Sequence, residues 1–390
     1  MLLTIIVFII ILSLLVFVHE LGHFMVARKF GVQAEEFGFG FPPRIWGIYK
    51  NQENKWQQVW GGGEAKNVAK TIYSLNWLPL GGFVKIKGEN GENPEEQDSF
   101  ASRPIWQRSI MLAAGVLMNF LLAMILIIIG FKIGLPQIID QVDSRAVIAD
   151  KKFQIVQILD NSPAAQANLK IGDTIISIDN HKFSNFEELQ KYVDSQIGKK
   201  LIYQIKRSQQ EFKNEIIPQS RPETGKGGIG IAIAETGLVS YPWHLAIWQG
   251  IKTSFLLVWA IVQAFYQLFK GLILGLGVTA ELAGPVGIAV LTGEVARMGF
   301  IYILQFTALL SLNLAVINFI PFPALDGGRF LFLLIERFRG LPIKREVENF
   351  IHNIGFILLM LLVLLVTFRD VSRLGDIGDK LKMLYQRIFG

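Results

Sequence analysis

The feature that most constrains the fold is an uncharged run of eighteen residues, Met1–Val18, which leads directly into His19-Glu20-Leu21-Gly22-His23. A run of this length without charge is typical of a helix that crosses a membrane. On a helix, positions i and i+4 share one face, so both imidazoles can approach one metal ion. Glu20 lies one step around the helix, where it can accept a proton from water. The pattern predicts zinc-assisted hydrolysis close to or within a bilayer.

Composition places the chain among membrane proteins that carry a soluble insert. Of its 390 residues, 51% are hydrophobic, and the mean hydropathy is +0.40, which exceeds that of ordinary soluble proteins. The net charge is +6, and excess Lys and Arg in such chains report topology and contact with anionic lipid. No basic run alternates with aromatic residues, so no nucleic-acid partner is predicted. The chain has no cysteine, so any zinc must be held by His and carboxylate.

Four uncharged stretches are long enough to cross roughly 30 Å of hydrocarbon. They are Met1–Val18, Ser109–Phe131, Met298–Leu325 and Asn349–Phe368. The first is interpreted as a retained span, because the first positive charge is Arg28 and a signal peptide would carry one before its apolar run.

The distribution of cations predicts which way these spans run. Residues 28–108 contain eleven Lys and Arg residues, so this region is predicted to be cytoplasmic. The motif at the end of the first span then approaches the cytoplasmic side, and a third span running inward brings Asp326 to the same depth. If the borderline stretch Thr253–Phe269 also crossed, the span after it would run outward, and Asp326 would emerge on the wrong side. We therefore expect this stretch to lie in the interface or to pack on the core without crossing.

Asp326 is the best candidate for a third metal ligand, because two histidines do not complete a zinc site. This carboxylate ends the uncharged run Met298–Leu325, and an acid at membrane depth needs a partner. Pro321 and Pro323 remove two backbone donors, which predicts a locally unwound segment. Irregular backbone at that depth is tolerated where it lines a cavity or is buried in protein. The segment therefore indicates a polar site inside the helix bundle.

Two regions lack the period of helices. Phe37–Pro43 is predicted to be a tight apolar loop, and Leu78–Gly81 a turn followed by a strand to Ile86. Residues 152–235 indicate one small α+β domain with an exit linker at Pro218–Gly230. Its strands are expected at Phe153–Ile158, Thr174–Ile178, Leu201–Ile205 and Phe212–Ile217, with a short capped helix at Asn161–Ala165 and a longer helix at Phe186–Val193.

Together these motifs resemble the site-2 protease family of intramembrane metalloproteases, of the M50 type, and in particular the bacterial regulator-of-sigma-E protease branch. The likeness covers nearly the whole chain. It is carried by H-E-L-G-H in the first span, by Asn-x-x-Pro-x-Pro-x-Leu-Asp-Gly ending at Gly327, and by a single PDZ-like insert between them. Further matches are Gly38-Phe39-Gly40, Pro79–Lys85, Phe100–Arg108 with Ala114-Gly115, and Gly284–Gly287.

The resemblance implies roles for individual residues. His19, His23 and Asp326 would bind one Zn²⁺ per chain, and Glu20 would be the general base. Asn313 and Asn318 would help to hold the substrate. The segment Gly82, Phe83, Val84, Lys85 and Ile86 would belong to a membrane re-entrant β-structure that pairs with unwound substrate.

The expected fold is a polytopic α-helical membrane protein with four transmembrane helices, a re-entrant β-structure and an inserted α+β PDZ-like domain. The expected parts are an N-terminal catalytic half with the second span, an extracytoplasmic PDZ-like domain, interfacial linker helices, a C-terminal catalytic half, and an amphipathic tail. Their boundaries are 1–131, 132–235, 236–297, 298–370 and 371–390.

The expected function is zinc-dependent endoproteolysis of single-span membrane proteins, either a membrane-bound anti-sigma factor or remnant signal peptides. The expected location is the bacterial cytoplasmic (inner) membrane, with lipid and single-span substrates as partners and a monomeric chain. Two alternatives from other classes are a non-catalytic adaptor that binds partners through its PDZ-like domain and a metal transporter. The complete His, Glu and Asp set argues against the adaptor, and a single ligand set argues against the transporter.

Several residues also have plain structural interpretations. Asp326 could cap a helix, Asn313 and Asn318 could form interhelical hydrogen bonds, and Gly81-Gly82 could form an ordinary hairpin turn. The insert could be a spacer. His181, His244 and His352 are expected to be structural or exposed, not ligands.

Overall fold

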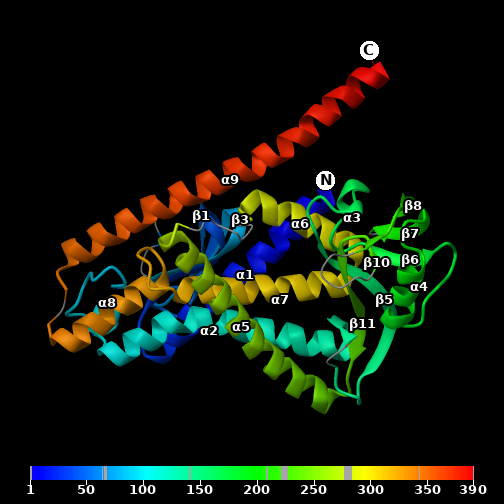
Figure 1. The fold of residues 1–390 in the computed structure, drawn as a ribbon. Helices are drawn as coiled ribbons and strands as arrows, with labels where there is room; N and C mark the ends of the chain where they lie inside the picture. The colour runs from blue at the N-terminus through cyan, green and yellow to red at the C-terminus, as the bar shows by residue number, and fades with distance from the viewer. Residues whose placement is uncertain are drawn as a thin grey trace. The chain divides into compact units, whose positions relative to one another are not determined.

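The chain divides into two compact units in the computed structural model (Figure 1). The first contains residues 1–126, 252–293 and 306–390, and the second contains residues 127–251 and 294–305. The structure describes residues 2–63, 65, 68–139, 142–207, 210–220, 227–275, 283–341 and 343–389, without the side chains of 345 and 373–389. Within the predicted exit linker, residues 221–226 lie outside this description, as do 276–282 of the predicted linker helices.

Long helices make up most of the first unit. The helices are α1 (Leu2–Lys29), α2 (Ile105–Ile133), α5 (Trp243–Ile273), α6 (Pro285–Met298), α7 (Phe300–Phe319), α8 (Asp326–Arg339) and α9 (Arg345–Phe389), with a 3₁₀ turn η1 at Phe100–Ser102. Helices α2, α5, α6 and α7 each continue into the second unit. The predicted tail is the continuation of α9, which runs unbroken through its 45 residues.

Five helices in the described residues are long and apolar enough to cross a membrane, where the sequence predicts four. They are α1, α2, α5, α7 and the part of α9 from Glu346 to Ser372. The additional one is α5, whose 31 residues extend the borderline stretch Thr253–Phe269 at both ends. Length and composition do not decide whether α5 crosses, so the four-span topology stays a prediction.

The unwound segment expected before Asp326 is present between α7 and α8. Helix α7 ends at Phe319, and α8 begins at Asp326. Pro321 lacks the amide hydrogen that a continuing helix needs, and it disfavours helical backbone in the preceding residue. Ala324 has a φ of 79°, in the left-handed region that residues other than glycine seldom adopt. The predicted span Met298–Leu325 is therefore a shorter helix followed by a tight turn.

A three-stranded sheet in the order β2-β1-β3 follows α1 in the sequence. Its strands are β1 (Ala34–Lys50), β2 (Trp56–Trp60) and β3 (Ile72–Ile86). The predictions of a loop at Phe37–Pro43 and a turn at Leu78–Gly81 were wrong, because both segments lie within strands. Bulges and bends let these Gly- and Pro-rich stretches remain paired: residues 36–39 face residues 82–85 on one side and 72–75 on the other.

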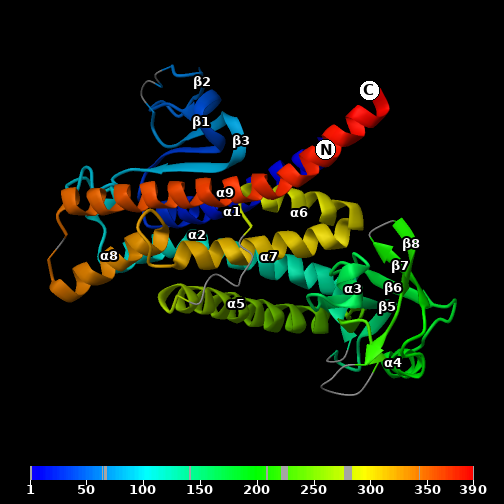
Figure 2. The same ribbon diagram turned by 45° about the horizontal axis from the view of Figure 1, so that its top comes forward.

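The sheet packs along α1, as Figure 2 shows for the blue strands. The Ser13 hydroxyl donates a hydrogen bond of 2.6 Å to the Pro79 carbonyl, and the Phe24 and Phe37 rings stack with centroids 4.4 Å apart. A side chain at Gly81 would collide with Val16, and one at Gly82 with the Phe17 backbone. Glycine at these two positions allows β3 to approach the helix that carries the His-Glu-Leu-Gly-His motif.

The second unit is built on a six-stranded antiparallel sheet in the order β4-β11-β5-β6-β7-β8. Its elements are β4 (Leu135–Ile138), β5 (Val147–Ile158), α3 (Pro163–Gln166), β6 (Thr174–Ile178), α4 (Phe186–Ser195), β7 (Leu201–Arg207), β8 (Gln210–Ile216) and β11 (Ile231–Ser240), with a small ribbon of β9 (Gln219–Ser220) and β10 (Gly227–Gly228). The strands and helices predicted from Phe153 to Ile217 are confirmed. Ile155, Ile178 and Ile205 are fully buried in its core.

The side on which α5 ends can be measured, because the chain has no native cysteine. Leu274 and Val147 are both exposed, and each can be replaced by a single cysteine. The four-span topology predicts that Leu274→Cys and Val147→Cys react with a membrane-impermeant maleimide added from the same side. Labelling of Leu274→Cys only from the side opposite to Val147→Cys would establish that α5 crosses and would contradict the four-span topology.

Candidate metal centre

Three side-chain atoms from two distant parts of the chain converge at one point in the first unit. The Asp326 Oδ2 atom lies 3.0 Å from His19 Nε2 and 3.3 Å from His23 Nε2, and the two Nε2 atoms are 3.2 Å apart. The histidines come from α1, where their exposed fractions are 6% and 7%, and Asp326 begins α8. Among the described residues, this is the one group of three His or acidic side chains that could hold a metal ion.

The spacing of these atoms fits a tetrahedral metal site. Zinc lies about 2.0–2.2 Å from nitrogen and carboxylate ligands, which places neighbouring ligand atoms roughly 3.3 Å apart. The observed separations are 3.0–3.3 Å. Asp326 Oδ2 is buried and receives no hydrogen bond in the described part of the chain, so a cation would supply the partner that this oxygen lacks.

Hydrogen bonds on the far side of each imidazole favour the ligating tautomer. His23 Nδ1 lies 2.8 Å from the Met111 carbonyl oxygen, which can only accept, so Nδ1 carries the hydrogen and Nε2 of a neutral ring is bare. His19 Nδ1 lies 3.3 Å from Nδ2 of the Asn119 side-chain amide, and Oδ1 of the same amide is buried without a partner among the described residues. With that oxygen turned to the ring, His19 also donates from Nδ1 and presents a bare Nε2.

Glycines let α1 and α2 approach closely at the metal centre. A side chain at Gly115 would collide with both imidazoles, and one at Gly22 would collide with the Ala114 carbonyl. Asn119 lies one turn further along α2 and is fully buried, and its backbone carbonyl accepts a hydrogen bond of 2.8 Å from Ser311 of α7. Helix α2 thus forms a second wall of the site. From the sequence, this region carried only the family motif Ala114-Gly115.

The turn before Asp326 is held by α9. The Ala324 amide donates a hydrogen bond of 3.0 Å to His352 Nδ1, at the residue with the left-handed backbone. Gly355 packs directly against Pro323, where a side chain would not fit. His352 is therefore structural, as expected, but its position one turn from Gly355 identifies it as a support for the Asp326 turn.

Asp326 is not the cap of α8, which was its structural alternative. The N-cap residue is Leu325, and no side chain caps it. The carboxylate lies in the first turn, where the partial positive charge of the helix N-terminus stabilises it. Gly327 and Gly328 pack against the backbone of residues 319–323, which leaves no room for side chains there. Asp326 is therefore free to face the histidines.

Two ion pairs fix the rest of α8 within the first unit. The Arg329 guanidinium lies 2.6 Å from a carboxylate oxygen of Glu89, in the segment after β3. Arg108 of α2 donates to both carboxylate oxygens of Glu336, at 2.6 and 3.2 Å. Such bidentate pairs add orientation as well as energy. They were not predicted, because neither sequence spacing nor composition relates Arg108 to Glu336.

Glu20 lies beside the third strand. Its Cβ and Cγ atoms are in van der Waals distance of the position that a side chain at Gly82 would occupy. Among the described residues, no hydrogen bond or ion pair of its carboxylate is recorded, so the group is not committed to a structural contact. Its position on α1 places it between the metal ligands and β3.

The two asparagines proposed for substrate binding differ in their surroundings. Asn318 Nδ2 lies 3.4 Å from His19 Nε2, so this side chain borders the metal centre. Asn313 donates instead to the Leu309 carbonyl of its own helix at 2.9 Å. Five residues advance an α-helix by about 500°, so the two side chains lie about 140° apart around α7. The structure brings Asn318, and not Asn313, to the metal ligands.

The segment Gly82–Ile86 is an edge of the sheet. Its residues pair with residues 34–39 of β1, in the register Phe39 to Gly82 and Ala34 to Ile86. In the described part of the chain its other edge has no strand partner. Val84 packs in the cluster of Phe24, Ala34 and Phe37, whereas Lys85 forms a 2.7 Å ion pair with Glu35. One edge of this strand is therefore available for a further strand.

Loss of the Asn119 amide tests its support of His19. We expect Asn119→Leu, which keeps a side chain of similar size, to lower affinity for the metal ion about 10-fold to 100-fold, as loss of such a hydrogen bond typically does. Competition with a chelator, read by metal analysis of the purified chain, measures the change. Ser220→Ala, in β9 of the second unit, is the control. An Asn119→Leu variant with the wild-type affinity would exclude the amide from orienting His19.

Comparisons with known proteins identify the family of the chain. The model of peptidase family M50 matches residues 7–60 and 64–362. Regulator of sigma-W protease RasP of Bacillus subtilis is 31% identical, over 95% of this chain and 99% of its own, and zinc metalloprotease RasP of Geobacillus kaustophilus is 30% identical, over 95% and 98%. Among solved structures, the PDZ domain of an SdrC-like protein of Listeria monocytogenes is similar at 27% identity, covering 21% of this chain and 85% of that one, with a TM-score of 0.20. The chain belongs to peptidase family M50 and is a metalloprotease of the multi-pass membrane type.

Proposed function

We propose that this protein is a zinc-dependent intramembrane endopeptidase that cleaves single-span membrane proteins. The observation that carries the proposal is the convergence of His19 Nε2, His23 Nε2 and Asp326 Oδ2 between helices long and apolar enough to cross a bilayer. Three electron-pair donors at ligand spacing are the protein part of a catalytic zinc site, which keeps its fourth position for water or substrate.

In this proposal, His19, His23 and Asp326 hold one Zn²⁺ per chain. When bound, the ion supplies Lewis-acid polarisation of the scissile carbonyl and lowers the pKa of water to about 7. The charge of Asp326 offsets part of the ion's charge, and Met111 and Asn119 keep both imidazoles in the tautomer that leaves Nε2 free. Asn318, 3.4 Å from His19, is placed to donate a hydrogen bond to substrate.

Glu20 is proposed to move the proton. Its carboxylate accepts a proton from the attacking water as the oxygen of that water bonds to the carbonyl carbon. It then delivers this proton to the amide nitrogen as the C–N bond breaks, leaving a carboxylic acid and an amine. Its place beside Gly82 would hold it next to substrate bound along β3.

Substrate binding by strand addition follows from the chemistry of helices. A transmembrane helix hides its carbonyls in i to i−4 hydrogen bonds, so it must unwind before water can attack. The free edge of Gly82–Ile86 could replace the lost hydrogen bonds and hold the peptide extended. The close packing of β3 on α1 supports such a strand beside the metal centre.

The orientation and substrate class are also proposals. The cations of residues 28–108 support an orientation with the metal centre towards the cytoplasm and the α+β domain outside. One relative is named a regulator of sigma-W protease, which supports a membrane-bound anti-sigma factor as substrate, with remnant signal peptides as the second class. The PDZ-like domain would then limit which substrates reach the centre.

The alternative is a non-catalytic adaptor that binds partners through its PDZ-like domain. A complete set of metal donors with a free carboxylate beside it argues against this alternative, since an adaptor has no use for either. Membership of a peptidase family argues the same way.

Replacing Glu20 and Asp326 separates catalysis from metal binding. Glu20→Gln removes the proton acceptor, so we expect kcat for a tagged single-span substrate to fall roughly 100-fold to 10,000-fold while zinc content stays unchanged. Asp326→Asn removes a charged ligand, so we expect it to lose both zinc and cleavage. Gel analysis of products and metal analysis of the purified chain measure the two effects.

Glu53→Gln is the matched control, because Glu53 is exposed and pairs with Lys55 in the turn after β1. It should match the wild type in both assays. Wild-type cleavage by Glu20→Gln would exclude the proposed proton transfer, and full zinc content in Asp326→Asn would remove Asp326 from the metal site.

A further inference from the structure

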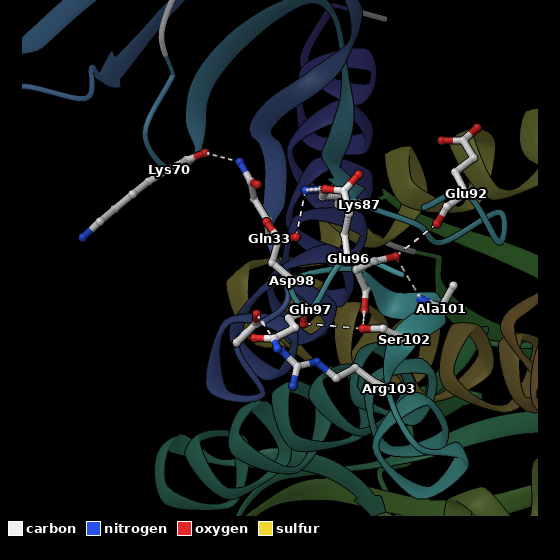
Figure 3. Close-up of polar contacts among 12 residues, drawn as sticks. Gln33, Lys70, Lys87, Glu92, Glu96, Gln97, Asp98, Ala101, Ser102 and Arg103 are labelled. Atoms are coloured by element: carbon white, nitrogen blue, oxygen red, sulfur yellow. Dashed lines mark hydrogen bonds and ion pairs between the residues drawn. The ribbon is translucent and has the colours of Figure 1, made fainter. Parts of the chain in front are cut away.

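A cavity of about 540 Å³ lies where α1 ends and the sheet begins, away from the metal ligands. Its lining includes Arg28 and Gln33 from the end of α1 and the following segment, Lys50 and Trp56 from the β1–β2 hairpin, and Lys70 and Tyr73 from the start of β3. Figure 3 shows one wall, where the Gln33 side chain donates to the Lys70 carbonyl at 3.2 Å and the Lys70 ammonium points away from that contact. Three of these residues are cations.

Aromatic groups, and not carboxylates, hold two of the cations. The Arg28 guanidinium lies 5.3 Å from the centroid of the Phe24 ring and 3.4 Å from the Tyr73 hydroxyl. The Lys50 ammonium lies 5.2 Å from the centroid of the Trp56 ring. Within the described residues, no ion pair neutralises Arg28, Lys50 or Lys70. Ring faces orient a cation without cancelling its charge, so the cavity keeps a positive potential.

The one acid that lines the cavity, Asp98, is held by Lys87. Asp98 accepts a 2.8 Å bond from Lys87, which also contacts Glu96 at 2.5 Å (Figure 3). These two carboxylates hold the pKa of Lys87 above its usual value. Lys87 therefore stays charged, and the cavity lining keeps a net positive charge, because it holds three cations and one acid.

The carbonyl groups at the end of α1 do not repel an anion in this cavity. A helix C-terminus normally presents free carbonyls and partial negative charge. In this chain the Val26, Ala27 and Arg28 carbonyls accept hydrogen bonds of 2.9–3.1 Å from the following residues. The chain turns at Gly31, whose φ is 72°. Three carbonyls of the last turn of α1 are therefore occupied.

The depth of the cavity points to the lipid headgroup layer. Helix α1 has 28 residues, so it is about 42 Å long, whereas the hydrocarbon core is about 30 Å thick. Its last turn, with Arg28, must therefore emerge among the headgroups. Trp56, which lines the cavity, is 59% exposed, and Trp60 at the other end of β2 is 66% exposed, as is typical of tryptophans at a membrane interface.

We propose that this cavity binds the phosphate of an anionic phospholipid headgroup, with Arg28, Lys50 and Lys70 as its cationic contacts. The Tyr73 and Thr71 hydroxyls can donate to the same phosphate. A soluble phosphate would meet the same groups, but the depth of Arg28 and the exposed tryptophans favour lipid. This site does not include the metal ligands or Glu20, so a test of lipid binding does not depend on the proposed function.

Native mass spectrometry of the full-length protein in detergent tests the proposal. The probes are phosphatidylglycerol, phosphatidylcholine with the same acyl chains, and inorganic phosphate. We expect one phosphatidylglycerol to bind more tightly than phosphatidylcholine, and Lys50→Gln, Lys70→Gln and Arg28→Gln each to lower its affinity about fivefold. Lys55→Gln makes the same charge change at an exposed residue paired with Glu53, and it should leave the affinity unchanged.

Lys50→Arg and Arg28→Lys keep the charge and should retain most of the lipid affinity, which separates loss of the contact from loss of the fold. Unchanged cleavage of a detergent-solubilised substrate checks that the Gln variants are folded. Equal lipid binding by wild type and all three Gln variants would overturn the proposal. Preferential binding of inorganic phosphate, with no preference among the lipids, would overturn the lipid assignment.

Discussion

The structure depends on the meeting of three side-chain atoms that come from two distant parts of the sequence. In the ligating tautomers His19 Nε2, His23 Nε2 and Asp326 Oδ2 all present lone pairs, at separations of 3.0–3.3 Å. Such a group is repulsive in an apolar helix bundle unless a cation occupies its centre. The surrounding fold, with Gly115 against the imidazoles and Met111 and Asn119 behind them, holds these atoms together. We therefore propose that a bound metal ion stabilises this arrangement as well as supplying its chemistry.

The histidines and Asp326 lie about 300 residues apart in the chain, and the contacts that join them lie in different elements. His352 and Gly355 of α9 hold the turn before Asp326, and the Arg329 and Arg108 ion pairs hold the helix after it. The same segment that carries Glu89 follows β3. The ion pair between Glu89 and Arg329 therefore links the segment after β3 to the helix that begins with the third donor.

The sequence predicted the parts of the site that depend on local pattern. Helical spacing places His19 and His23 on one face, and an acid after a long uncharged run with two prolines identifies Asp326. Pattern failed for β1 and β3, because Gly40 and Gly81 bend these strands and Pro42 and Pro43 are typical of loops. The bends let residues 36–39 of β1 pair with two separate parts of β3, residues 72–75 and 82–85. No local sequence pattern predicts such double pairing. Asn119 and the Arg108–Glu336 pair depend on tertiary contact alone, so a single sequence could not identify them.

X-ray absorption at the zinc edge tests most directly whether these residues form the metal centre. The account predicts two imidazoles and only oxygen atoms as the remaining ligands in the purified wild-type chain. Asp326→Asn should lose the metal, and His352→Gln should keep two imidazoles, because His352 supports the turn and does not ligate. A zinc ion with one imidazole, with three, or with two that persist in a His19→Ala variant would contradict the account.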